Sequence, residues 1–138
     1  MESFLWNIGI KVQNLTKELE RSRKIGAKVL LCYSLNIESK SYDLALIQLA
    51  DKYIIMGESL PYERLLEKPL NEGCAHVVYA VEDFEKKIRT AIEAGATLIG
   101  KPFNETSPLG KRRVALFKTP GGMLLEYIQI ITNLVPEI

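Results

Sequence analysis

The sequence has one histidine, and it stands at a position where it could do chemistry. His76 opens the apolar run Val77–Val81, and any acid–base role that uses an imidazole must use this residue. The alternative is a structural role, because a lone histidine at the start of an apolar strand is often simply a hydrogen-bonded residue. In either role, the strand that follows has to hold the ring in place.

Glu126 is a second candidate, because it lies inside the apolar segment Met123–Ile131. A carboxylate on the inward face of a strand is costly unless it is paired or bound to a metal ion. A carboxylate that points to solvent needs no special role. The basic run Lys111–Arg113 is a third candidate, since it could clamp an anionic substrate or could be an ordinary solvated charge run.

The elements that must position these residues occur twice. Residues 7–30 and 76–99 align without a gap at an offset of 69 (76 − 7). Each copy is an apolar strand, a polar turn, an amphipathic helix, a glycine stop and a new strand. A repeat of this length predicts two halves that share one core, because it is too long for most solenoids and too short for independent domains. Matched positions include Val12 with Val81, Leu19 with Ile88 and Gly26 with Gly95.

Both copies continue into further strands. The first copy predicts strands at residues 4–12, 28–35, 42–49 and 53–56, with a helix that Asn14 caps. The second copy predicts strands at residues 75–81, 97–103, 112–118 and 123–131, a helix capped by Asp83, and a loop at residues 104–111. Residues 59–73 are expected to connect the halves, with one helical turn.

The predicted order is therefore βαβββ, twice. Three consecutive strands joined by short turns pair antiparallel, whereas the strand–helix–strand unit needs a crossover. We expect an α+β fold in which two modules, at about residues 4–58 and 74–131, form curved mixed sheets around a shared cleft. Residues 1–138 then make a single domain.

Composition narrows the possible partners. The formal net charge of +1 argues against a nucleic-acid or membrane surface, and no apolar run approaches the length of a membrane helix. The N-terminal residues lack the basic part of a signal peptide. Cys32 and Cys74 stand in apolar segments without metal-like spacing, so buried thiols and a cytoplasmic setting are expected.

Two segments of the sequence resemble the vicinal oxygen chelate superfamily, which includes glyoxalase I, methylmalonyl-CoA epimerase and bleomycin-binding proteins. Residues 117–129, FKTPGGMLLEYIQ, are similar to the superfamily's closing strand, turn and ligand-bearing strand. Residues 73–83, GCAHVVYAVED, are similar to its Gly-x-x-His strand. The resemblance extends over about residues 5–129 and implies a glyoxalase/bleomycin resistance-like fold, although one scaffold carries unrelated chemistries.

The resemblance also implies a metal site with one ligand from each of four strands. His76 and Glu126 match the second-half ligands, and Asn7 stands at the first-strand position, where it is a poor ligand for zinc or nickel. The fourth-strand ligand is either Met56, if the hairpins are matched through their turns, or Glu58, if the spacing is measured from His76. Both point the same way along a strand, so alternation leaves the choice open.

Two classes of function follow from this resemblance, and a structural or regulatory module with an empty cleft is a third reading. One is a small-molecule-binding protein of the bleomycin-resistance type with a degenerate metal site, which Asn7 favours. The other is a metal-dependent lyase or isomerase acting on a small oxygenated metabolite, in which Glu126 or Glu58 moves a proton beside a carbonyl. A divalent metal ion is the only cofactor implied. We also expect a homodimer, because exposed sheet edges and an open cleft favour symmetric association.

Overall fold

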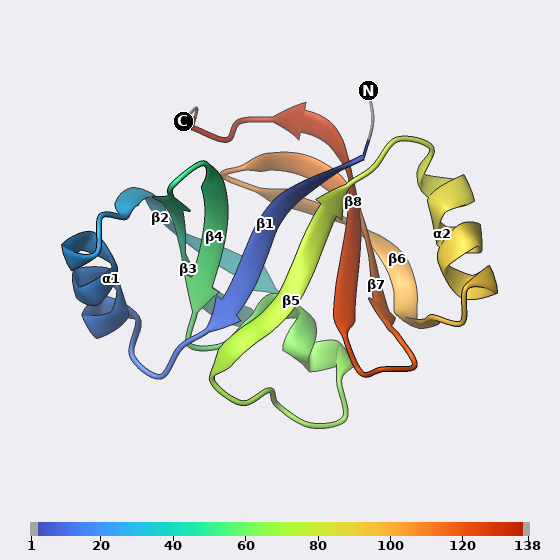
Figure 1. Cartoon of the computed structure of the whole chain (residues 1–138), viewed down its shortest axis with the longest axis horizontal. Helices are drawn as coiled ribbons and strands as arrows, with labels where there is room; N and C mark the ends of the chain where they lie inside the picture. The colour runs from blue at the N-terminus through green and yellow to red at the C-terminus, as the bar shows by residue number, and fades with distance from the viewer. Residues whose placement is uncertain (1–2, 137–138) are drawn as a thin grey trace. The chain divides into compact units, whose positions relative to one another are not determined.

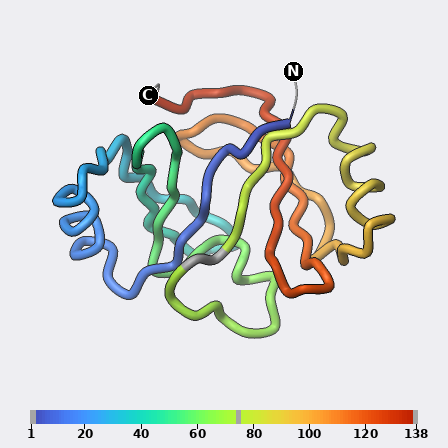
Figure 2. Tube along the Cα trace, in the orientation of Figure 1, coloured from blue at the N-terminus to red at the C-terminus, as the bar shows by residue number. Residues whose placement is uncertain are grey.

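The computed structural model describes residues 3–136 of the chain, together with the side chains of these residues except 74 and 75. The chain divides into two compact units. Among the described residues, the first-repeat unit comprises Asn7–Ala75 and Pro136, and the second-repeat unit comprises residues 3–6 and His76–Val135. Figures 1 and 2 show the course of the chain through both units.

The first repeat consists of β1 (Phe4–Lys11), of which Asn7–Lys11 belong to the first-repeat unit, then α1 (Leu15–Lys24), β2 (Lys28–Ile37), β3 (Lys40–Leu49) and β4 (Lys52–Gly57). The 3-10 helix η1 (Pro61–Leu65) follows. The strands of this repeat lie in the order β2-β3-β4-β1. The β2–β3 and β3–β4 pairs are antiparallel, and β1 pairs with β4 in parallel. This is the pairing that two short turns and one crossover helix require.

The second-repeat unit repeats the same order with β5 (Gly73–Ala80), α2 (Phe84–Glu93), β6 (Thr97–Ser107), β7 (Gly110–Lys118) and β8 (Leu124–Asn133). Its strands lie in the order β5-β8-β7-β6, with β5 parallel to β8 and the other pairs antiparallel. Two βαβββ modules with mixed sheets are therefore present, and the predicted α+β fold class is confirmed.

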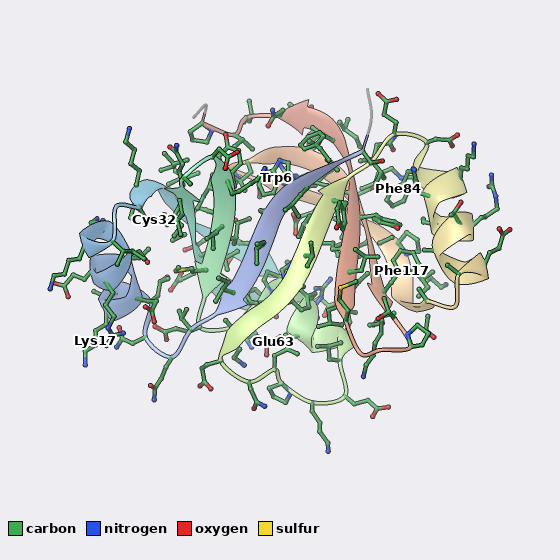
Figure 3. All side chains as sticks on the ribbon, viewed as in Figure 1. Trp6, Lys17, Cys32, Glu63, Phe84 and Phe117 are labelled. Atoms are coloured by element: carbon green, nitrogen blue, oxygen red, sulfur yellow. The ribbon has the colours of Figure 1, made fainter. Side chains whose placement is uncertain are left out.

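Each helix packs on one face of the sheet of its own unit. In the first-repeat unit the buried cluster beneath α1 contains Val12, Leu19, Ala27, Ala45, Ile47 and Met56. In the second-repeat unit, Phe84 and Phe117 belong to the cluster between α2 and the sheet, and both are labelled in Figure 3. Because side chains alternate across a strand, these clusters also identify the residues that face away from the helices.

The helix starts follow only partly from the sequence. Asn14 caps α1 as predicted, since its Oδ1 accepts a hydrogen bond of 3.0 Å from Lys17 N. Asp83 occupies the N-cap position of α2 but makes no side-chain capping hydrogen bond, and its backbone is left-handed with φ 50°. The predicted cap is therefore wrong for α2, because the left-handed backbone does not aim the carboxylate at the first-turn N–H groups.

Two further expectations are wrong. Residues 104–111 are not a loop, because β6 runs to Ser107 and forms a hairpin with β7. Pro102 lies within β6, in the irregular stretch of the ladder between Ile99 and Phe103, where an edge strand tolerates a missing N–H. Cys32 is exposed rather than buried, and the side chain of Cys74 lies outside the described residues.

Candidate functional site

His76 and Glu126 lie next to each other in the second-repeat unit. Strand β5 carries His76 and β8 carries Glu126, and the parallel register pairs Val78 with Glu126. The two side chains therefore project from the same face, two residues apart along the ladder. His76 Nε2 lies 3.6 Å from Glu126 Oε1, which is an ion-pair distance when the imidazole is protonated but long for a hydrogen bond.

This pair lies on the face of the sheet that points away from α2. Leu125 and Tyr127 contact the helix-side cluster, so alternation places Glu126 on the opposite face. The His76 side chain is 7% exposed and the Glu126 side chain 16%. The cross-strand neighbour of Glu126 is Leu116, which is buried. A carboxylate in this apolar setting is costly, and the adjacent imidazole offsets that cost when it is protonated.

Arg112 adds a buried cation to the same face. It pairs across the ladder with Ile130, four residues beyond Glu126 on β8, and this spacing places the two backbones about 13 Å apart. Its guanidinium carbon lies 4.9 Å from the centre of the Trp6 ring, and Nη2 donates a hydrogen bond of 3.1 Å to the Leu109 carbonyl. Trp6, whose contribution the sequence did not indicate, is labelled in Figure 3.

The rest of the basic run points elsewhere. Arg113 projects toward α2, where Nη2 lies 2.7 Å from Glu85 Oε1 and the guanidinium lies over the Phe84 ring. Lys111 is exposed. In the sequence, Lys111–Arg113 form one basic run, whereas strand alternation places Arg112 on a different face from its two neighbours and buries it.

Asn7 belongs to the first-repeat unit, on the face of β1 that points away from α1. Its Cα partner on β4 is Tyr53. The residue is 4% exposed, and its Oδ1 is buried without a hydrogen-bond partner among the described residues. An unsatisfied buried carbonyl costs about 1–3 kcal/mol. A ligand or a water molecule that donates a hydrogen bond to Oδ1 would remove this penalty.

Glu58 lies far along the same sheet from Asn7. It follows β4 directly, and Asn7 is opposite Tyr53, so five residues of strand separate the two positions, or about 16 Å. Glu58 Oε2 accepts a hydrogen bond of 2.9 Å from Leu15 N at the start of α1. A carboxylate at this place satisfies a free N–H of the first helical turn, which is a structural role.

Met56 packs in the helix-side cluster of the first-repeat unit and so faces α1. The ladder registers identify a different counterpart of Glu126. Val78, which pairs with Glu126, corresponds to Gly9 at the repeat offset of 69 (78 − 9), and Gly9 pairs with Ile55. Ile55 is therefore the structural counterpart of Glu126, and it has no metal-binding atom.

These residues do not form a conventional metal site. Transition-metal sites usually take three or more protein ligands, drawn from His, Cys and carboxylates. Among residues 3–136, apart from the side chains of 74 and 75, no three such side chains cluster in a way that could hold a metal ion. His76 and Glu126 supply two donors, and this set alone does not fit a tightly bound transition metal. A metal-ligand role for Asn7 or Glu58 stays a prediction.

Two βαβββ modules with this strand order define the vicinal oxygen chelate fold, and the comparisons with solved structures place the chain within that fold class. A hypothetical protein from Bacillus halodurans is 21% identical, with a TM-score of 0.72 and 100% coverage of both chains. Methylmalonyl-CoA epimerase from Mycobacterium tuberculosis is 17% identical, with a TM-score of 0.67 over 93% of this chain and 88% of that one.

A second branch of the superfamily gives a similar result. A variant of 4-hydroxymandelate synthase from Streptomyces coelicolor is 12% identical, with a TM-score of 0.63 over 99% of this chain and 51% of that one. No protein-family model and no curated protein matches the sequence. At these identities the likeness establishes the fold, and the predicted resemblance is confirmed at that level. In the described part of the chain, no helix has the length and apolar character needed to cross a membrane.

Proposed function

We propose that the chain is a small-molecule-binding protein of the glyoxalase/bleomycin-resistance type, and that its ligand contacts His76 and Glu126. The observation that carries this proposal is the buried His76–Glu126 pair, 3.6 Å apart, on the sheet face that points away from α2. Small-molecule sites typically combine an apolar lining with a few convergent polar groups. Val78, Leu116 and Ile128 supply the apolar lining beside this pair.

The polar groups limit the chemistry of the ligand. His76 can donate or accept a hydrogen bond, and an ionised Glu126 can only accept one. A small oxygenated compound with a hydroxyl and a carbonyl group therefore suits the pair. Arg112, about 13 Å further along the sheet, gives an anionic group on a longer ligand a cation to face. The same face thus favours an elongated, oxygenated ligand over a purely apolar one.

Isomerase activity is the second candidate. Methylmalonyl-CoA epimerase is among the structural neighbours, and the chain keeps a histidine next to a carboxylate. In this function Glu126 would take a proton from the carbon beside a carbonyl, and protonated His76 would donate a hydrogen bond to the carbonyl oxygen. The face of that carbon to which the proton is returned would then set its configuration. The counterpart position Ile55 offers no ligand for a metal that would assist this step.

Binding should be tested on the whole chain with a fragment library of hydroxy and keto acids, using NMR chemical shifts. We expect ligands that shift the resonances of His76 and lose their affinity in His76→Ala and Glu126→Gln. Glu85→Gln is the matched control, because it makes the same change on the helix side of the sheet. Ligands that bind all three variants as tightly as the unmodified chain would contradict the proposal.

Two measurements separate the candidates. Deuterium incorporation beside the carbonyl of methylmalonyl-CoA in D₂O, lost in Glu126→Gln, would support the isomerase; its absence would support a binding protein. Elemental analysis before and after EDTA treatment should find less than one equivalent of zinc, nickel or manganese, because two donors hold such ions weakly against water. A stoichiometric metal ion that survives dialysis and is lost in His76→Ala would favour a metal-dependent enzyme.

A further inference from the structure

A cavity lies within the first-repeat unit, between α1 and the helix side of its sheet. Its volume is about 580 Å³, which is within the usual range of small-molecule pockets. The sheet contributes Ile10, Ile47, Ile54 and Met56, and the end of α1 contributes Ile25. The cavity and the His76–Glu126 pair therefore belong to different units. The cavity lies on the helix side of its sheet, whereas the pair lies on the side that points away from the helix.

The second repeat explains why this space is open. Ile47 pairs with Ile54 in the first repeat, and Phe117 pairs with Leu125 at the same place in the second, so Ile47 corresponds to Phe117. In the same way, Met56 pairs with Ala45 and Tyr127 pairs with Ala115, so Met56 corresponds to Tyr127. The repeat offset of 69 matches Ile10 with Tyr79 (79 − 10). Three aromatic positions of the second repeat are thus aliphatic in the first.

Those aromatic rings pack closely in the second-repeat unit. The centres of the Phe117 and Tyr127 rings are 5.4 Å apart, and those of Tyr79 and Tyr127 are 6.5 Å apart. Phe117 is completely buried. In the first-repeat unit the smaller side chains at these positions, Ile10, Ile47 and Met56, line the cavity. An apolar space of this kind is a site that an apolar group from outside can fill.

The charged groups that line the cavity are two carboxylates and one lysine ammonium group. Glu18 from α1 lines it, with Oε1 3.5 Å from Arg21 Nη1, and Glu72 from the segment before β5 lines it at an exposed position. Ser22 is already used, since its Oγ donates a hydrogen bond of 2.8 Å to the Glu18 carbonyl. Lys11 also lines the cavity, but its Nζ is 2.7 Å from Glu63 Oε2. The surroundings therefore favour a ligand that is neutral or cationic over an anion.

We propose that this cavity is a binding site for a small aromatic amine, or for a neutral compound with one aromatic ring, whose ring takes the place that aromatic side chains occupy in the second repeat. The ring packs against Ile47 and Met56. An amino group points toward Glu18 and Glu72. This site is separate from the His76–Glu126 pair, so either binding proposal can be contradicted without affecting the other.

The test uses 4-phenylbutylamine, indole and 4-phenylbutyrate as probes, titrated into the whole chain with methyl-labelled isoleucine. The amine should bind more tightly than the carboxylate and should shift the methyl resonances of Ile10, Ile47 and Ile54. Ile47→Phe combined with Met56→Tyr brings in the residues of the second repeat. Filling the space in this way should weaken the amine about tenfold or more, because a well-filled core resists an added ring.

Ile131→Phe is the matched control, since it adds the same ring at a position that is 59% exposed. It should leave binding of the amine unchanged. Glu72→Lys changes an exposed position and should reverse the preference between amine and carboxylate, so it decides the question even if the added rings disturb folding. Equal binding by the filled variant, resonance shifts spread over the whole surface, or a probe-induced change in sedimentation mass would each overturn the proposal, the last by identifying a second copy as the occupant.

Discussion

Glu63 shows how much a single residue can matter without any sign in the sequence, where it belongs to a charged connecting segment. Its Oε2 lies 2.7 Å from Lys11 Nζ and accepts a hydrogen bond from Leu70 N, and its Oε1 accepts one from Leu60 N. The side chain is 8% exposed. It therefore ties η1 and the following segment, which Figure 3 shows beside the label of Glu63, to β1.

The ionisation of Glu63 predicts how stability depends on pH. Burial raises the pKa of Glu63, but the hydrogen bonds from Leu60 N, Lys11 and Leu70 N outweigh burial and hold it below its ordinary value. The folded state thus binds the proton less readily than the unfolded state. Its stabilising contribution is complete above the ordinary pKa of about 4.3 and is lost as pH falls through the lower pKa of the folded state.

We expect Glu63→Gln to lower the free energy of unfolding by about 3 kcal/mol at pH 7, because Lys11 loses its buried partner. The difference from the unmodified chain should shrink as the pH is lowered below about 4. Urea unfolding at pH 7, 5, 4 and 3 measures this difference. Glu67→Gln changes an exposed carboxylate of the same segment and is the control. A constant difference between the two chains at all four pH values would contradict the assignment.

The candidate site was predictable only where residue type was enough. His76 and Glu126 were candidates because a single histidine and a carboxylate within an apolar strand are unusual, and the structure places their side chains 3.6 Å apart. Ile55 was missed because it depends on the ladder register, which sequence spacing gave as either Met56 or Glu58. Arg112 is separated from its basic neighbours by strand alternation and by its contact with Trp6, more than a hundred residues away in sequence.

At the scale of the elements, local signals predicted the order of helices and strands well. Glycine stops, amphipathic periodicity and hairpin turns are all local, and the order βαβββ follows from them. The extent of β6 was not predictable in this way. Residues 104–107 have turn-like composition, and they form a strand because β7 supplies ladder partners from Gly110 to Arg113. Pairing between strands thus overrides local preference.

The two helix N-termini give a matched test of capping. Asn14→Ala should lower the free energy of unfolding by about 1 kcal/mol, because it removes the hydrogen bond to Lys17 N. Asp83→Gly should be neutral or stabilising, because Asp83 makes no capping bond and glycine adopts its left-handed backbone without strain. Thermal and urea unfolding of both variants measures this contrast. An equal loss in both would show that Asp83 caps α2 in solution.

At the scale of the whole molecule, the repeat carries most of the information. The same strand order and the same pattern of parallel and antiparallel pairs occur in both units. What differs between them is chemistry. The second repeat keeps His76, Glu126 and its aromatic packing, whereas the first has Asn7, Ile55 and an open cavity at the corresponding places. The second-repeat unit thus carries a buried polar pair, and the first-repeat unit carries an unsatisfied amide oxygen and a cavity with an apolar floor.

Association of the chain is the last prediction. Phe4 is 42% exposed and Ile131 is 59% exposed in the second-repeat unit, where β6 also ends the run of paired strands. Exposed apolar side chains and strand edges favour pairing with another chain, and symmetric dimers are the commonest soluble oligomers. We expect light scattering to give twice the mass of one chain. Phe4→Ser with Ile131→Ser should shift the mass toward the monomer, because both changes remove exposed apolar area without touching the core.

Ile92→Ser makes the same kind of change at a 48% exposed position on α2 and should leave the dimer intact. A mass of one chain across a wide concentration range would contradict the prediction.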